Sequence, residues 1–87
     1  MKAIKGEDIR VGMLLLETKT QYPKLVRVTA LGSRSFNATV IASSAYSVGH
    51  ESLWTKEFRF WSELTEDEAV LWTFKLGQVT KGLPWIQ

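Results

Sequence analysis

The side-chain types that nucleophilic catalysis requires occur together in one short stretch of the chain. Three serines, a histidine and a glutamate lie between positions 43 and 51: Ser43, Ser44, Ser47, His50 and Glu51. A catalytic triad needs a nucleophile beside a base that a third group orients, and rigid, separate elements normally supply the three. This stretch is small and polar and contains Gly49, which is typical of a solvated loop. We therefore expect a protein that is not an enzyme.

Metal and phosphate-loop chemistry is also poorly supplied. Zinc sites take three or four Cys, His or carboxylate ligands, and the chain has no cysteine and a single histidine. Gly6 and Gly12 are not followed by the Gly-Lys-Ser/Thr sequence of a phosphate loop. Four acids lack the spaced oxygen ligands and central glycine of a calcium loop: Glu63, Glu66, Asp67 and Glu68. The sequence predicts no metal, no cofactor and no small-molecule substrate.

Basic residues outnumber acidic ones in the first two thirds of the chain. Residues 1–61 hold nine Lys and Arg against five Asp and Glu. Small barrels bind nucleic-acid strands through surfaces that combine cations with aromatic rings. Such a surface is expected to use Tyr22 for stacking and the cations Arg10, Lys19, Lys24, Arg27 and Arg34. Arg27 is expected on the exposed face of a strand, and Lys19, Lys24 and Arg34 in turns; ordinary solvated charge is the alternative.

The segment from Ala69 to Leu76 favours a second kind of binding, to another protein or to a second copy of the chain. Six of its eight residues are apolar, and Thr73 and Lys75 are the polar ones. A helix that packs on a sheet normally keeps one face polar, so this one needs a cover. The cover is either the apolar tail of the chain or a partner that contacts Trp72, Phe74, Leu76 and Trp85.

Association with a protein is the leading functional hypothesis from the sequence, and nucleic-acid binding is the alternative. A short, aromatic-rich chain without a catalytic constellation is typical of many bacteriophage accessory proteins. By that analogy, the partner would be a host enzyme that the chain inhibits by occlusion, or another phage protein.

Alternating apolar and polar residues predict four strands, over 13–17, 25–31, 36–42 and 53–61. Residues 32–35 separate the second and third of these as a hairpin turn. The alternation places Phe36, Ala38, Val40 and Ala42 on one face. In the last and longest strand it places Trp54, Lys56, Phe58 and Phe60 together, opposite Thr55, Glu57, Arg59 and Trp61.

The residues after position 64 carry the start and stop signals of a helix. Thr65 is an N-cap, with Glu68 three residues later as its capping-box partner. Leu64 and Ala69 occupy the positions of a hydrophobic staple, and Gly77 is a C-terminal stop. A strand over residues 69–74 is the rival interpretation, because Val, Trp, Thr and Phe favour strands.

Length and composition predict one domain over residues 1–87, with a core from about 4 to 76 and a tail from 77 to 87. Charged residues interrupt the first twelve positions, so no signal peptide is expected. No apolar run approaches the roughly 18 residues of a membrane span. We expect a cytoplasmic protein that does not contact a membrane.

The segment Asp8-Ile9-Arg10-Val11-Gly12-Met13, followed by three leucines, resembles the opening of many small SH3-like barrels. In these, an acidic-apolar-x-Val-Gly segment turns the chain into the first strand. The resemblance covers residues 4–61 and implies a fold but no particular family or ligand. The expected fold class is thus mostly β, an SH3-like barrel or a strongly bent antiparallel sheet with one C-terminal helix.

Overall fold

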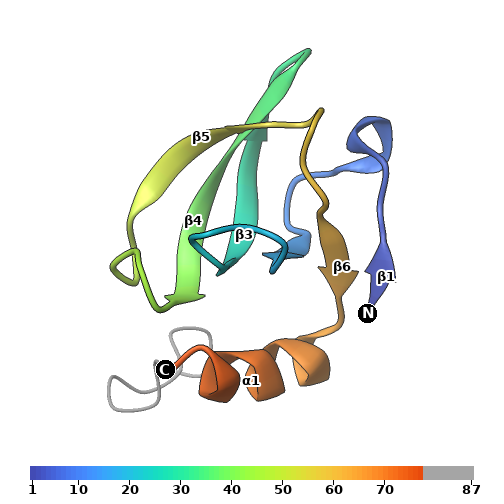
Figure 1. The fold of residues 1–87 in the computed structure, drawn as a ribbon. Coiled ribbons are helices and arrows are strands. Elements are labelled where there is room, and N and C mark those ends of the chain that lie inside the picture. The colour runs from blue at the N-terminus through green and yellow to red at the C-terminus, as the bar shows by residue number, and fades with distance from the viewer. Residues whose placement is uncertain (78–87) are drawn as a thin grey trace.

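The computed structural model describes residues 1–77. They form a six-stranded antiparallel sheet followed by one helix (Figure 1). The strands are β1 (Lys2–Ala3), β2 (Leu14–Glu17), β3 (Lys24–Leu31), β4 (Ser35–Ser43), β5 (Glu51–Thr55) and β6 (Ser62–Leu64), with a 3-10 helix η1 (Gly6–Asp8) and a helix α1 (Glu66–Lys75). The expectation of a mostly β fold with one helix near the C-terminus is confirmed.

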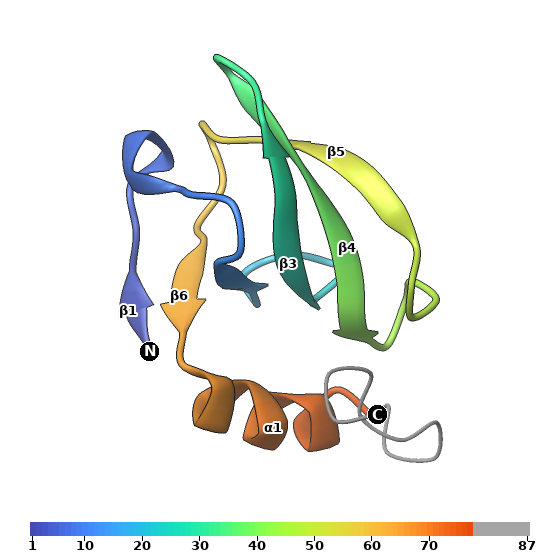
Figure 2. The same cartoon turned by 180° about the vertical axis from the view of Figure 1, so that it is seen from behind.

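The strand order in the sheet is β1-β6-β2-β3-β4-β5. Strands β2 to β5 form a meander in which each strand is antiparallel to the next. The chain then returns, and β6 inserts between β1 and β2, where Leu14 pairs with Leu64. The sheet curves strongly, with β5 bending across the β3–β4 hairpin (Figures 1 and 2), but it does not close, so β1 and β5 are its edges.

The sheet buries apolar side chains in two clusters. The first is rich in aromatic rings, and it contains Ile9, Leu15, Val26, Val28, Phe36, Ala38, Val40, Trp54 and Trp61. The second lies under α1, which packs against β3, β4 and β6, and it contains Leu14, Leu16, Leu25, Ile41, Ala42, Leu64, Ala69 and Leu76. Strand β2 supplies both clusters, because alternate leucines of a strand point to opposite faces.

A β-bulge corrects one predicted face. Phe36, Ala38 and Val40 share the aromatic cluster as expected, but Ala42 lies in the helix-side cluster. Val26 pairs with Val40 and Leu25 with Ala42, so Ile41 is an extra residue in β4. An extra residue reverses the alternation of side chains beyond it. A prediction that assumes strict alternation along the strand does not anticipate this reversal.

The predicted helix begins where its capping signals place it. The Thr65 hydroxyl accepts from the Glu68 backbone N–H, and the Glu68 carboxylate accepts from the Thr65 N–H. The N-terminal ammonium and this backbone N–H hold the pKa of the Glu68 carboxyl below its ordinary value. The helix ends before Gly77, whose φ of 81° suits glycine. The helix interpretation of residues 69–74 is confirmed and the strand alternative is wrong.

The single strand predicted over residues 53–61 is wrong. Strand β5 ends at Thr55, residues 56–60 bend away from the sheet, and β6 begins at Ser62. The longest strand is instead β4, with nine residues. Phe58 adopts a φ of 62°, which no strand residue has.

Within residues 1–77 no helix is long and apolar enough to cross a membrane. The predicted tail lies outside the described residues, apart from Gly77.

Candidate functional site

Residues 56–61, called the β5–β6 loop from here on, are fixed at both ends. The Lys56 backbone N–H donates to the Arg34 carbonyl (3.0 Å) in the β3–β4 turn. The Thr55 hydroxyl donates to the Glu57 carbonyl (3.1 Å), and the Trp61 indole N–H donates back to the Thr55 carbonyl (3.3 Å). These bonds define the base of the loop, so its apex has a set position relative to the sheet.

Two phenylalanines of this loop project into solvent. Phe58 is 98% exposed and Phe60 is 70% exposed. A large apolar side chain contributes about 1.5–3 kcal/mol to folding only when it is buried. Phe58 also occupies the left-handed backbone region, which costs a residue with a Cβ roughly 1–2 kcal/mol. Phe58 therefore weakens the fold and gains no burial in return, a combination that points to a role outside folding.

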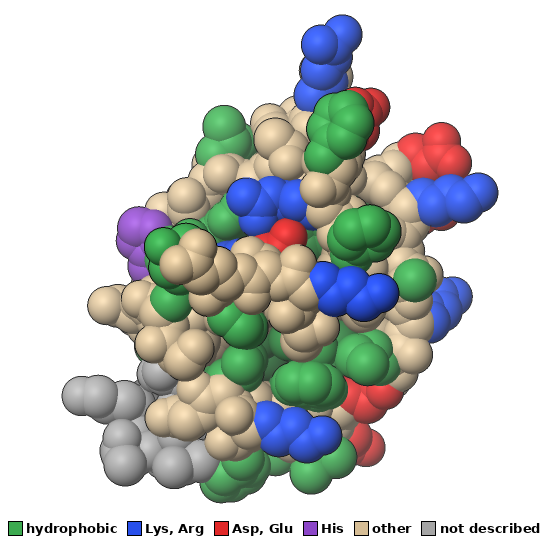
Figure 3. All heavy atoms as spheres, in the orientation of Figure 1, with side chains coloured by type: hydrophobic (Ala, Val, Ile, Leu, Met, Phe, Trp, Pro, Cys, Tyr) green, Lys and Arg blue, Asp and Glu red, His purple; other side chains and the backbone are tan. Residues whose placement is uncertain are grey.

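Cations flank the loop on both sides. One depression, of about 280 Å³, is lined by Lys5, Gly6, Glu7, Ser33, Arg34, Lys56 and Glu57. A second, of about 170 Å³, is lined by Ala3, Ile4, Thr18, Lys19, Arg59, Phe60, Trp61 and Ser62. Figure 3 shows one face of the molecule, on which Lys and Arg side chains are interspersed with hydrophobic ones. The loop thus combines two exposed rings with five cations in or beside it, against two acids, Glu7 and Glu57.

Gly6 allows the N-terminal segment to lie directly against the loop. A Cβ at Gly6 would stand 2.7 Å from the Cβ of Lys56 and 2.9 Å from its carbonyl oxygen. Only a residue without a side chain permits this approach. It brings Lys5 and Lys56 to the same depression.

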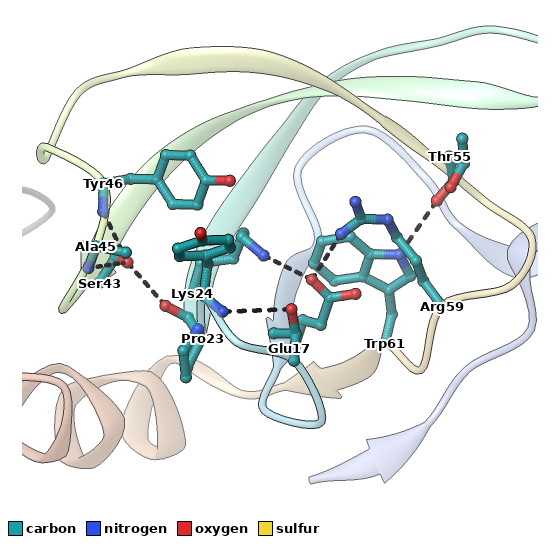
Figure 4. A network of polar contacts seen from close by, with 11 residues as sticks. Glu17, Pro23, Lys24, Ser43, Ala45, Tyr46, Thr55, Arg59 and Trp61 are labelled. Atoms are coloured by element: carbon teal, nitrogen blue, oxygen red, sulfur yellow. Dashed lines mark hydrogen bonds and ion pairs between the residues drawn. The ribbon is translucent and has the colours of Figure 1, made fainter.

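Below the loop lies a buried charge network (Figure 4). Glu17 Oε1 accepts from Lys24 Nζ at 2.6 Å and from Arg59 Nη1 at 2.7 Å. The side chains of Lys24 and Glu17 are 1% and 4% exposed, whereas that of Arg59 is 34% exposed. Three rings surround the Lys24 ammonium, with centroids 5.4–5.9 Å away: Tyr46, Trp54 and Trp61. Arg59 therefore links the buried network to the loop surface.

The structure brings together two of the cations predicted for nucleic-acid binding. Lys19 lies over the Phe60 ring, 5.4 Å from its centroid, and Arg34 lines the depression on the other side of the loop. Lys24 corrects the prediction, because it lies in β3 and not in a turn. Its ammonium is buried against Glu17, which makes it a structural cation.

The remaining predicted cations lie elsewhere. Arg27 is half-buried, donates to the Gly12 carbonyl and pairs with Glu66 at 3.0 Å, at the helix side of the sheet. Arg10 donates to the backbone carbonyls of Glu7 and Ile9. Tyr22 is 48% exposed and meets the Tyr46 ring edge to face at 6.3 Å. These three residues do not join the loop surface.

Helix α1 presents part of its predicted binding set. Phe74 is 55% exposed, and Trp72 is half-buried beneath Lys75, whose ammonium lies 4.6 Å from a Trp72 ring centroid. Leu76 corrects the prediction, because it is buried in the helix-side cluster. Leu71, which the prediction omitted, is 63% exposed. Trp85 lies outside the described residues.

In the stretch of residues 43–51, the Ser43 and His50 side chains contact the backbone and a neighbouring ring and do not contact one another as in a triad. The buried Ser43 hydroxyl donates to the Pro23 carbonyl (2.7 Å) and accepts from the backbone N–H groups of Ala45 and Tyr46. The His50 ring stacks on Tyr46 at 5.8 Å. Among residues 1–77, no three His, Asp or Glu side chains gather as they would around a metal ion.

The β5–β6 loop is not predictable from the residues that usually form turns, because it contains none of them. Residues 56–60 are Lys-Glu-Phe-Arg-Phe, with no Gly, Pro, Asn or Asp, and alternating aromatic residues favour a strand. One signal was available. A strand over 53–61 would place Trp54, Phe58 and Phe60 on one face and Trp61 on the other, an excess of rings for so small a core.

No protein-family model, no curated protein and no solved structure matches this chain.

Proposed function

We propose that this protein is a non-enzymatic binding module that takes single-stranded nucleic acid on the β5–β6 loop. The observation that carries the proposal is Phe58, a fully exposed ring held in an unfavourable backbone conformation. Phe60, two residues later, supplies a second exposed ring. Two rings on one loop suit two unpaired bases, because an aromatic side chain stacks on any base that is not held in a duplex.

The five cations in and beside the loop outnumber the two acids there, Glu7 and Glu57, which favours a polyanion over a protein surface. Three of the five flanking cations are lysines: Lys5, Lys19 and Lys56. Lysine is depleted in protein interfaces, whereas phosphate backbones attract Lys and Arg alike. Protein surfaces that bind single-stranded nucleic acid without sequence preference combine exposed aromatic rings with cations in this way.

Binding of a fluorescently labelled oligothymidine, followed by anisotropy at low salt, tests the proposal. Phe58→Ala and Phe60→Ala should each weaken binding by about 1–3 kcal/mol, or roughly 5- to 150-fold in Kd. Leu53→Ala is the matched control, because Leu53 is also apolar and exposed, at 62%, but lies on β5 outside the loop. It should leave Kd unchanged.

The same titration distinguishes the competing interpretations. Absence of binding to the oligomer at low salt, or equal Kd values for Phe58→Ala and the wild type, would overturn the proposal. Tighter binding to duplex than to the single strand would also contradict it, because paired bases are not free to stack on the loop.

Protein association through α1 is a second candidate function. It is supported by Leu71 and Phe74, which are 63% and 55% exposed on the helix, and it would allow the chain to act by occluding a partner enzyme. Sedimentation of the wild type across a concentration series, beside Phe74→Asp, tests self-association. A wild type that stays monomeric, and that captures the same proteins as Phe74→Asp, would remove this candidate.

We also propose that residues 4–61 form an open relative of the SH3-like barrel. The meander of β2 to β5 after the Asp8–Met13 turn supports this. Hydrogen exchange checks it, since the outward amides of the β5 edge should exchange fast in an open sheet and slowly in a closed barrel.

A further inference from the structure

The smaller depression beside the loop is lined by four polar and four apolar residues, and no acid is among them. The polar residues are Lys19, Arg59, Thr18 and Ser62, and the apolar ones are Ala3, Ile4, Phe60 and Trp61. Its volume of about 170 Å³ is below the roughly 300–1,000 Å³ of pockets that enclose a whole small molecule. It has room for one charged group and not for a complete ligand.

The charges at this pocket are not balanced within the described part of the chain. Glu17 is the one acid that contacts Arg59, and it also pairs with the buried Lys24. One carboxylate therefore serves two cations. Lys19 has no carboxylate within ion-pair distance among residues 1–77, and its ammonium lies over the Phe60 ring. The pocket keeps an excess of positive charge at the solvent boundary.

We propose that this pocket binds one phosphate group, with the Arg59 guanidinium and the Lys19 ammonium as its charged ligands. The inference deepens the proposed function and rests on it, because the phosphate would belong to the strand whose bases stack on Phe58 and Phe60. A guanidinium has five N–H donors, and Arg59 uses one of its nitrogens on Glu17. The other donors suit the several oxygens of a phosphate.

The position of Phe60 explains how one nucleic-acid strand can contact both the pocket and the exposed rings of the loop. Its ring lines the pocket and is 70% exposed. A phosphate in the pocket would therefore place the adjoining nucleotide against this ring. Glu17 holds Arg59 at the pocket edge, and the Phe60 contact does the same for Lys19, so both cations are positioned before the ligand arrives.

Salt dependence of oligothymidine binding is the first test. Each phosphate contact contributes about −0.7 to the slope of log K against log salt for a single strand. Lys19→Gln should make the slope shallower by about 0.7, and Arg59→Gln should do so as well. Lys75→Gln is the matched control, because it removes the same charge from α1 and should leave the slope unchanged. Thermal melts of all three variants show whether each remains folded.

Inorganic phosphate alone is the second probe. Titrating it into the wild type should shift the backbone amide signals of Thr18, Lys19, Phe60 and Ser62, and Lys19→Gln should reduce these shifts. Shifts scattered over other lysines, with none at the pocket, would overturn the proposal.

The two tests separate failure of this site from failure of the proposed function. Oligomer binding that needs Phe58 but keeps the wild-type salt slope in Lys19→Gln and Arg59→Gln would refute the phosphate pocket and leave the function standing. Phosphate shifts confined to the pocket, in a protein that binds no oligomer, would support the pocket and refute nucleic acid as its source.

Discussion

Two contacts between a lysine ammonium and aromatic rings have similar geometry in this molecule, but one is buried and the other lies on the surface. Inside, the Lys24 ammonium lies among Tyr46, Trp54 and Trp61 and pairs with Glu17 at 2.6 Å. On the surface, Lys19 lies over Phe60 at a similar distance from the ring, 5.4 Å. The geometry is alike, but the surface cation has no acid beside it within residues 1–77.

The difference follows from solvation. A buried ammonium loses its water, so it needs a counter-charge and hydrogen bonds from the protein. An exposed ammonium keeps its water, and a ring beside it costs the protein little. The interior cation therefore has its counter-charge within the protein, and removing that counter-charge is costly. The surface cation is free to take its counter-charge from a ligand.

Glu17→Gln should produce the largest effect, because it removes the counter-charge of the interior cation. Breaking a buried pair by removing one partner costs about 3–5 kcal/mol, since Lys24 stays buried without an anion. Urea denaturation measures the loss. Glu66→Gln is the control, because it breaks the exposed pair with Arg27 and should cost less than about 1 kcal/mol. Equal losses of stability in the two variants would mean that the buried ion pair contributes no more than the exposed one.

Phe58→Gly should change the free energy of unfolding in the opposite direction from Glu17→Gln, and by a smaller amount. Glycine adopts a φ of 62° without a Cβ penalty, and no buried contact is lost. The free energy of unfolding should rise by about 1 kcal/mol, while oligothymidine binding weakens. Denaturation and anisotropy on the same sample measure both. A destabilised Phe58→Gly would show that the ring supports the fold, which would remove the main argument for a binding role.

Lys19→Gln should have the smallest effect on stability. The Lys19 side chain is exposed and forms no ion pair within residues 1–77. A surface substitution of this kind changes the free energy of unfolding by less than about 0.5 kcal/mol. Thermal melts check this beside the salt-slope measurement. A loss of stability comparable to that of Glu17→Gln would show that Lys19 supports the fold as Lys24 does, which would contradict the distinction between the buried and the surface cation.

Some parts of the fold were predictable from short stretches of sequence. Thr65, Glu68 and Gly77 specify where α1 begins and ends, because capping bonds join residues three or four positions apart. The β3–β4 hairpin was predictable for the same reason, since a turn of a few residues joins two alternating strands. In the candidate site, Lys19 and Arg34 were named from the sequence, whereas Phe58, Arg59 and Phe60 were read as strand residues.

The sequence by itself determined helix α1, the β3–β4 hairpin, the mostly β composition and the presence of cations beside aromatic rings. Only the tertiary structure decided which ring faces water and which cation is buried. Trp54 and Phe58 share the face of a strand in the sequence pattern, yet one is 5% exposed and the other 98%. The physical reason is that β6 must return to pair with β2, so the chain leaves the sheet after Thr55 and carries Phe58 into solvent. Lys24 is buried for a similar reason, because its neighbour Glu17 lies opposite it across β2 and β3, a pairing set by the sheet and not by sequence distance.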